Sequence, residues 1–168
     1  MILVAIGANL PGTGGRTPLQ TCLDAVQALT KLTELQLHSV SRWYETEPVP
    51  RSDQPNYVNG VVRLTRRDGA AICPKRLLAS LQAIENRFGR ARSEPNAART
   101  LDLDLIDLDG LIRTAPDPIL PHPRAHERAF VLLPLLDVAP DWVHPVSGQS
   151  AKALLEATGQ RAVRLLVV

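Results

Sequence analysis

Residues 99–106, RTLDLDLI, constrain the fold of this chain more than any other stretch. Apolar and acidic residues alternate strictly there, and this pattern predicts a β-strand with one buried face. Because side chains at i and i+2 share a face of a strand, Asp102 and Asp104 stand side by side, while the neighbouring leucines face the opposite layer. Adjacent carboxylates repel each other unless a cation lies between them, and Mg²⁺ favours one or two carboxylates together with substrate phosphates. The stretch therefore indicates phosphoryl-transfer chemistry.

An isolated Asp-x-Asp pattern is more often the solvent-facing side of an edge strand, so the pair needs support from its surroundings. Asp107 and Asp109 fit that plainer interpretation. They lie where the strand gives way to a two-residue hairpin signal, and we expect both to be turn and surface residues. The acidic pair differs because guanidinium groups, which suit bidentate phosphate recognition, gather before it. These groups belong to Arg87, Arg90, Arg92 and Arg99.

The composition favours one domain with small-molecule partners. The chain has 168 residues, of which 45% are hydrophobic, so we expect residues 1–168 to form a single domain. The net charge is only +2, whereas nucleic-acid binders usually carry a clear basic excess, so we expect no nucleic-acid partner. The apolar run at residues 2–6 is too short for a signal peptide or a membrane span. We interpret it as the first strand and expect no membrane contact.

The two cysteines indicate a reducing compartment. Cys22 and Cys73 are too few for a disulfide framework and have no metal-ligand spacing. Both lie beside apolar residues, so we expect reduced thiols in or near the core. This usage is typical of a cytoplasmic protein.

Periodicity and turn residues predict an α+β fold. We expect strands at residues 2–6, 35–44, 57–65 and 99–106, and helices at residues 17–32 and 74–88, with Gly89 as the stop of the second helix. In chain order these elements read βαββαβ, the ferredoxin-like plan, in which helices pack on an antiparallel sheet. Two more short helices, at residues 125–136 and 149–158, and a strand at residues 162–167 complete the expected fold.

Four blocks of sequence carry a resemblance to a known family. They are AIGANL at 5–10, YETEP at 44–48 with DQPNYVN at 53–59, RTLDLD at 99–104, and PHPRAHERAF at 121–130. Over nearly the whole chain, they resemble 6-hydroxymethyl-7,8-dihydropterin pyrophosphokinase of folate biosynthesis. The resemblance implies an enzyme that transfers the β,γ-pyrophosphoryl group of ATP to the pterin hydroxymethyl oxygen and releases AMP. The pterin hydroxyl would attack the β-phosphorus in line, assisted by two Mg²⁺ ions.

The resemblance also assigns roles on the phosphate side. It implies that Asp102 and Asp104 are the Mg²⁺ ligands and that Arg92 and Arg99 are catalytic residues that bind phosphate. Further nucleotide contacts are implied for Gln82, Glu85, Leu105, Ile119, His122 and Arg128.

On the pterin side, the resemblance implies that Tyr57 and Phe130 sandwich the bicyclic ring by offset stacking. Asn59 shares a strand face with Tyr57 and offers both a donor and an acceptor to the edge of the pterin. The other implied pterin contacts are Gly7, Thr46, Glu47 and Val49.

One loop departs from the family pattern. Many members carry a Trp-Gly-Pro run where this chain has Asn96-Ala97-Ala98. We expect residues 89–98 to close over the triphosphate, and the missing aromatic to weaken that closure.

Two alternatives use the same features. A ferredoxin-like RNA- or ligand-binding module would need exposed aromatics on its central strands, and the acidic strand disfavours RNA phosphates. A different two-metal phosphotransferase or a nuclease would use the same carboxylates. We favour the pyrophosphokinase interpretation. We expect ATP and the hydroxymethyl pterin to be the small-molecule partners, and we expect the protein to be a monomer.

Overall fold

A computed structural model describes residues 1–48, 50–89, 98–159 and 163–167 of the chain. Its six strands form one sheet in the order β5-β1-β4-β3-β6, with β2 paired to another part of β4, and every pairing is antiparallel. The strands are β1 (Ile2–Ala8), β2 (Leu35–Val40), β3 (Tyr44–Thr46), β4 (Tyr57–Arg66), β5 (Asp102–Leu108) and β6 (Val163–Leu165).

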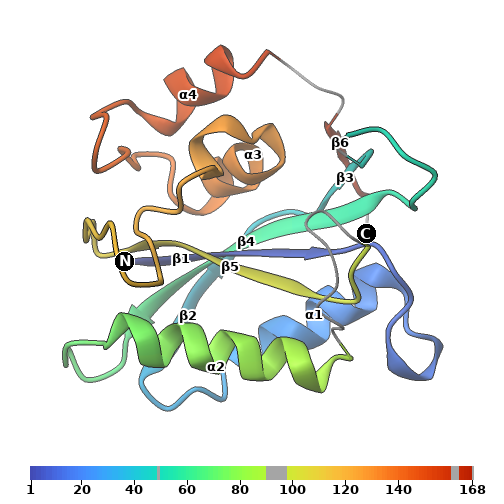
Figure 1. The fold of residues 1–168 in the computed structure, drawn as a ribbon, viewed down its shortest axis with the longest axis horizontal. Helices are drawn as coiled ribbons and strands as arrows, with labels where there is room; N and C mark the ends of the chain where they lie inside the picture. The colour runs from blue at the N-terminus through green and yellow to red at the C-terminus, as the bar shows by residue number, and fades with distance from the viewer. Residues whose placement is uncertain (49, 90–97, 160–162, 168) are drawn as a thin grey trace.

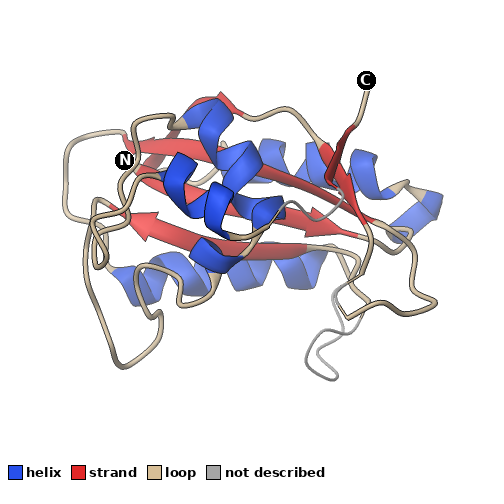
Figure 2. Ribbon diagram, turned by 90° about the horizontal axis from the view of Figure 1, so that it is seen from above, coloured by secondary structure: helices blue, strands red, loops and turns tan. Residues whose placement is uncertain are grey.

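Helices cover both faces of this sheet (Figures 1 and 2). One face carries α1 (Pro18–Leu29) and α2 (Pro74–Arg87), and the other carries α3 (Ala129–Val138), against which α4 (Ala151–Ala157) packs. Two short 3₁₀ turns are η1 (Thr13–Gly15) and η2 (Ala125–Glu127). The predicted α+β, ferredoxin-like architecture is confirmed, and β3 and β6 extend its sheet. No helix within the described residues is long and apolar enough to cross a membrane.

Local sequence signals account for the ends of the first two helices. Thr17 caps α1 through a capping box, in which its hydroxyl accepts from Gln20 N at 3.3 Å and Gln20 Oε1 accepts from Thr17 N at 2.9 Å. After α2, Gly89 adopts a φ of 79°, a left-handed conformation that suits glycine and ends the helix where the sequence predicts.

Two apolar layers hold the helices to the sheet, one on each face. The leucines that alternate with the acidic pair, Leu103 and Leu105, pack in the layer beneath α1 and α2, which also contains Trp43. The opposite layer, beneath α3 and α4, contains Trp142. The predicted alternation of residues 101–105 is therefore correct, and it leaves the acidic side chains on the α3 side.

The expected single strand at residues 35–44 is divided in the structure. Residues 41–43 form no strand, and β2 ends at Val40 while β3 begins at Tyr44. At the break, Ser41 Oγ accepts a hydrogen bond from Val61 N at 2.9 Å. The side chain of Arg42 turns away from the sheet toward Asp137 of α3. These long-range contacts redirect the chain between the two strands.

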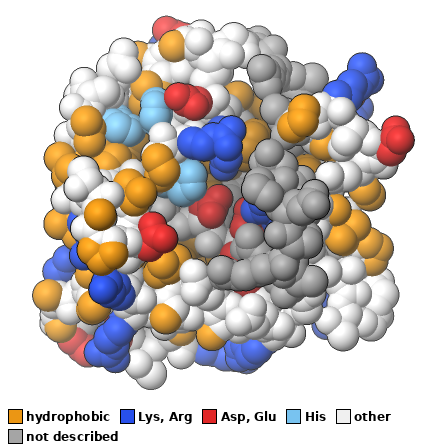
Figure 3. Space-filling model, in the orientation of Figure 1, with side chains coloured by type: hydrophobic (Ala, Val, Ile, Leu, Met, Phe, Trp, Pro, Cys, Tyr) orange, Lys and Arg blue, Asp and Glu red, His pale blue; other side chains and the backbone are white. Residues whose placement is uncertain are grey.

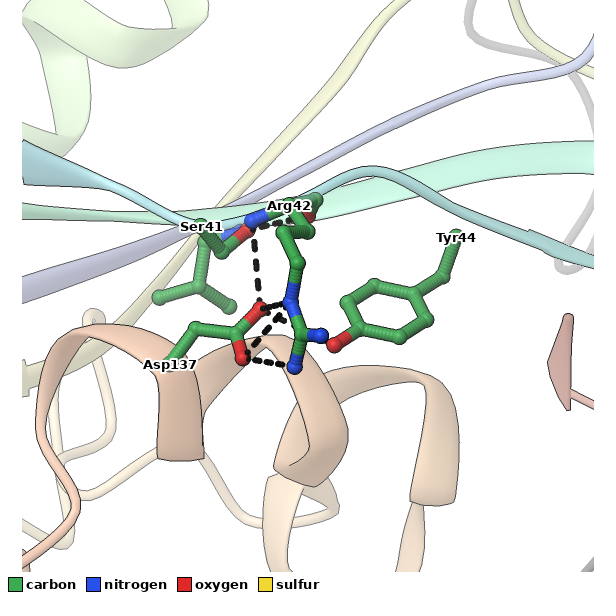
Figure 4. A network of polar contacts seen from close by, with 5 residues as sticks. Ser41, Arg42, Tyr44 and Asp137 are labelled. Atoms are coloured by element: carbon green, nitrogen blue, oxygen red, sulfur yellow. Dashed lines mark hydrogen bonds and ion pairs between the residues drawn. The ribbon is translucent and has the colours of Figure 1, made fainter. Parts of the chain in front are cut away.

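Asp137 is the centre of the network drawn in Figure 4. It accepts hydrogen bonds from Arg42 Nη2 at 2.6 Å, from Arg42 N at 3.1 Å and from Tyr44 Oη at 2.9 Å. Burial of the carboxyl acts in the opposite direction, but the hydrogen bonds from Arg42 and Tyr44 hold the pKa of Asp137 below its usual range. The network fixes β3, which ends at Thr46, against α3.

Asp107 is not the surface residue that the sequence predicts. Its side chain is buried, and its carboxylate accepts hydrogen bonds from Trp142 Nε1 at 2.8 Å and Gly110 N at 2.7 Å. The β1–β5 register shifts between Leu3 and Val4, and this irregularity turns Asp107 toward the layer that contains Trp142. Asp109 does lie in the turn, with a φ of 53°.

Two other predictions need correction. Cys22 is buried as expected, and burial raises the pKa of its thiol to about 12, but Cys73 is exposed at the position before α2. The single helix expected at residues 125–136 is instead η2 followed by α3, because Arg128 between them has an extended backbone.

Candidate active site

A cavity of about 860 Å³ lies where β1, β4 and β5 face the start of α3. Basic, acidic and histidine side chains gather near the centre of this face of the molecule (Figure 3). Ten residues predicted for the site line the cavity: Gly7, Thr46, Glu47, Tyr57, Asn59, Arg99, Asp102, Asp104, Arg128 and Phe130. Segments separated by more than a hundred residues in sequence thus meet at one site.

The acidic pair of β5 lies among basic side chains of this cavity. The guanidinium of Arg99 pairs with the carboxylate of Asp102, and Arg128 Nη1 lies 3.9 Å from Asp104 Oδ2. Burial, and then the charge of Asp102, raise the pKa of Asp104 to about 7. The Asp104 carboxylate therefore lacks sufficient positive charge around it. This is an arrangement that a divalent cation would satisfy, because two neighbouring carboxylates offer the hard oxygen ligands that Mg²⁺ prefers.

His122 faces the same carboxylate as a neutral ring. Its Nδ1 accepts a hydrogen bond from Arg124 N at 3.1 Å, which leaves the proton on Nε2, 3.9 Å from Asp104 Oδ2. Burial, and then the charge of Arg128, lower the pKa of His122 to about 4. At neutral pH the contact between His122 and Asp104 is therefore no ion pair, and Nε2 presents a neutral N–H group to the site.

Arg128 joins the charged part of the cavity to its aromatic part. Its guanidinium lies over the ring of Phe130, 5.6 Å from the ring centre, as well as near Asp104. Burial lowers the pKa of Arg128, but a guanidinium keeps its charge in proteins. The extended backbone at Arg128, directly before α3, directs this side chain and that of Phe130 into the cavity.

The remaining wall combines aromatic and amide groups from β4 and β3. Asn59 Nδ2 donates to Thr46 Oγ1 at 2.9 Å, and both side chains are buried. Tyr57, two residues before Asn59 on β4, donates its hydroxyl to Gln54 Oε1 at 3.3 Å. Gly7 pairs with Asn59 in the sheet, so the floor between these groups has no side chain. Together with Phe130, these aromatic and amide groups line one part of the cavity, which we call the slot.

Five predicted nucleotide contacts do not line this cavity. Glu85 is buried, and its carboxylate accepts a hydrogen bond from Leu103 N at 2.7 Å, which joins α2 to β5. The Leu105 side chain packs in the core instead of lining the cavity. Ile119 is exposed, Gln82 lies on α2, and His122 reaches the site from its rim. Arg92, Val49 and most of the predicted closing loop lie outside the described residues.

Sequence reasoning missed several residues of the site. Asn9, in the AIGANL block, has no predicted role, yet it is buried and hydrogen-bonded to the segments on both sides of the cavity. Gln54 and Arg124 line the cavity from loops, and Thr158 and Gly159 reach it from the end of α4. An asparagine directly after the first predicted strand was the available sequence signal for Asn9, but its hydrogen-bond partners are distant in sequence.

Comparison with known proteins gives one consistent result. The family model of 7,8-dihydro-6-hydroxymethylpterin-pyrophosphokinase (HPPK) matches residues 3–140. The 2-amino-4-hydroxy-6-hydroxymethyldihydropteridine pyrophosphokinase of Pseudomonas aeruginosa is 39% identical over 156 residues, 93% of this chain and 90% of that protein. The protein of the same name from Synechocystis sp. is 35% identical over 161 residues, 96% of this chain and 77% of that protein.

Longer proteins share the same region. Folic acid synthesis protein fol1 of Pneumocystis carinii is 34% identical over 155 residues, which are 92% of this chain but only 20% of that protein. The crystal structure of wild-type Plasmodium falciparum HPPK-DHPS superposes with a TM-score of 0.63 at 12% identity, covering 93% of this chain and 44% of that one. At that identity, the likeness shows the fold alone.

Proposed function

Because the chain belongs to the 7,8-dihydro-6-hydroxymethylpterin-pyrophosphokinase family, we propose that its cavity binds ATP and 6-hydroxymethyl-7,8-dihydropterin together. The pyrophosphoryl group of ATP passes to the hydroxymethyl oxygen, giving AMP and the pterin diphosphate used in folate synthesis. One observation carries this proposal: the aromatic and amide slot and the carboxylate pair of β5 line the same cavity, and the pKa of Asp104 is raised there.

Asp102 and Asp104 are the residues that would hold Mg²⁺, and we propose two ions. When held by these carboxylates, Mg²⁺ would supply positive charge that neutralises the phosphates during an in-line displacement. The described residues contain no group of three or more His, Cys, Asp or Glu side chains suited to a metal. This fits a cation whose coordination is completed by substrate phosphates, as is usual for Mg²⁺.

The basic groups of the cavity would bind the triphosphate. We assign Arg99 and Arg128 to phosphate oxygens, because both already lie beside the acidic pair and a guanidinium binds phosphate bidentately. His122 adds a neutral Nε2–H donor. Arg92 is proposed as a further catalytic cation from sequence resemblance alone.

The slot would position the pterin. Tyr57 and Phe130 supply stacking faces, and Asn59 and Thr46 supply the edge contacts. With the ring held there, the hydroxymethyl oxygen attacks the β-phosphorus while the bond to the oxygen bridging the α- and β-phosphorus breaks. AMP leaves with that oxygen, and the hydroxyl proton passes to solvent. Catalysis therefore consists mainly of positioning and charge stabilisation.

A product analysis tests the proposal. The purified protein is incubated with ATP, Mg²⁺ and the hydroxymethyl pterin, and adenine nucleotides are separated chromatographically. We expect AMP and pterin diphosphate in equal amounts, and none with Asp104→Asn. Formation of ADP would indicate a different phosphotransferase, cleavage of added RNA would indicate a nuclease, and no product with retained ligand binding would indicate a binding module.

We also propose that the enzyme acts as a monomer in the cytoplasm. The carboxylate pair and the aromatic and amide groups of the proposed site line one cavity of this chain. Sedimentation velocity with both ligands present would test the oligomeric state.

A further inference from the structure

Asn9 lies at the point where three neighbouring strands stop pairing. In the sheet, β1 runs between β5 and β4, and its last pairs are Gly7 with Asp102 and Ala8 with Val58. Arg99 lies in the segment before β5 and Gln54 in the segment before β4, and both residues line the cavity. Asn9 follows Ala8 directly, and only 1% of its surface is exposed.

On the phosphate side, Asn9 holds the main chain of Arg99. The backbone N–H groups of Asn9 and Leu10 both donate to Arg99 O, at 3.0 and 3.1 Å. In return, Arg99 N donates to Asn9 Oδ1 at 2.8 Å. The guanidinium of the same arginine pairs with Asp102, so Asn9 fixes the backbone of the residue that carries this cation.

On the pterin side, the same side chain holds the loop before β4. Asn9 Nδ2 donates to Pro55 O at 3.1 Å and to Gln54 Oε1 at 3.3 Å. Gln54 Oε1 also accepts the hydroxyl of Tyr57, at 3.3 Å. The side-chain oxygen of Asn9 thus accepts a hydrogen bond from Arg99 on the phosphate side. Its NH₂ group donates to the loop before β4 on the pterin side.

We infer that Asn9 is a positioning residue that couples the pterin and nucleotide subsites. The inference rests on the proposed function. Hydrogen bonds run without a gap from Tyr57 through Gln54 and Asn9 to Arg99 and Asp102, so a ligand that orders one end also orders the other. Such coupling is reciprocal: bound nucleotide raises pterin affinity by the factor by which bound pterin raises nucleotide affinity. Asn9 itself does not line the cavity.

The test measures this coupling factor by calorimetry. Pterin is titrated into the protein with and without Mg²⁺ and a non-hydrolysable ATP analogue, and the ratio of the two dissociation constants is the factor. In the wild type we expect about fivefold or more, the lower end of usual allosteric couplings. Asn9→Leu, which removes the side-chain hydrogen bonds on both sides, should bring the factor close to one. A wild-type factor of one would overturn the inference.

A second set of variants avoids the buried position. Gln54→Leu removes the side-chain oxygen that accepts from both Asn9 and Tyr57 and should reduce the factor, whereas Gln54→Glu keeps an acceptor oxygen and should restore it. Trp142→Phe is the matched control, because it also deletes a buried hydrogen bond, to Asp107, away from the cavity. It should leave the factor at the wild-type value.

The outcomes separate the inference from the proposed function. If the wild type binds neither pterin nor the ATP analogue, the proposed function fails. If the wild type shows coupling and the Asn9 and Gln54 variants retain it, Asn9 is only structural and the inference fails. Loss of coupling in Trp142→Phe as well would also overturn the inference, because the coupling factor would then depend on the overall stability of the protein and not on Asn9.

Discussion

Replacing Asp104 by asparagine should stabilise the ligand-free protein at alkaline pH while abolishing pyrophosphoryl transfer. The pKa of the Asp104 carboxyl is raised from 3.8 to about 7 by burial and by Asp102. A raised acid pKa means that the folded state resists ionisation, so the unfolded state releases this proton first. Stability from this site is therefore lost as the pH rises from about 4 to about 7, and the loss is complete above that range.

The size of the effect follows from the pKa difference. About 3 pKa units at 1.36 kcal/mol each give roughly 4 kcal/mol as an upper limit. One third of the Asp104 side chain is exposed, so solvent screens the charge, and we expect on the order of 1–2 kcal/mol. Asparagine cannot ionise, so Asp104→Asn should exceed the wild type by this amount at pH 8 and by little at pH 4.5.

Urea unfolding in the presence of a chelator measures the two free energies at each pH. Asp24→Asn is the control, because it removes one carboxylate from an exposed ion pair outside the cavity. We expect the advantage of Asp104→Asn to appear only at the higher pH and to disappear when Mg²⁺ and an ATP analogue are added to the wild type. An advantage of equal size at pH 4.5 and pH 8 would refute it.

Three further predictions concern other groups. Tyr57→Ala and Phe130→Ala should each weaken pterin binding by about 1 kcal/mol beyond lost burial while nucleotide binding stays unchanged, as separate calorimetric titrations would show. Because the pKa of His122 is about 4, its ring should show no NMR titration between pH 5.5 and 7.5; an inflection there would contradict its neutral state. Because the pKa of Asp137 is depressed, its network should stabilise the fold above the ordinary aspartate pKa and lose that effect as the pH falls further, so Asp137→Asn should flatten the acid limb of the stability profile.

Local patterns were sufficient to predict the ferredoxin-like core. The period of two in β5 placed its leucines in one layer and its acids on the other face, and Gly89 ended α2 as expected. These features depend on neighbours within a few residues. The same holds for Asp102 and Asp104, whose shared face is a property of the strand alone.

The errors came from contacts that are distant in sequence. Asp107 is buried because a register shift turns it toward Trp142, and nothing near Asp107 in the sequence indicates that partner. The strand expected at residues 35–44 breaks because Arg42 binds Asp137, which lies 95 residues away. Asn9 was overlooked for the same reason, since Arg99, which donates to its side-chain oxygen, lies 90 residues further along the chain.

The sheet separates the chain's two tryptophans, and this gives each layer its own optical reporter. Trp43 belongs to the layer beneath α1 and α2, and Trp142 belongs to the layer beneath α3 and α4. The indole of Trp142 bonds to a carboxylate, while Trp43 packs among apolar side chains, so their emission should differ in environment. Two single-tryptophan variants would show by fluorescence whether the two faces of the sheet unfold together or one before the other.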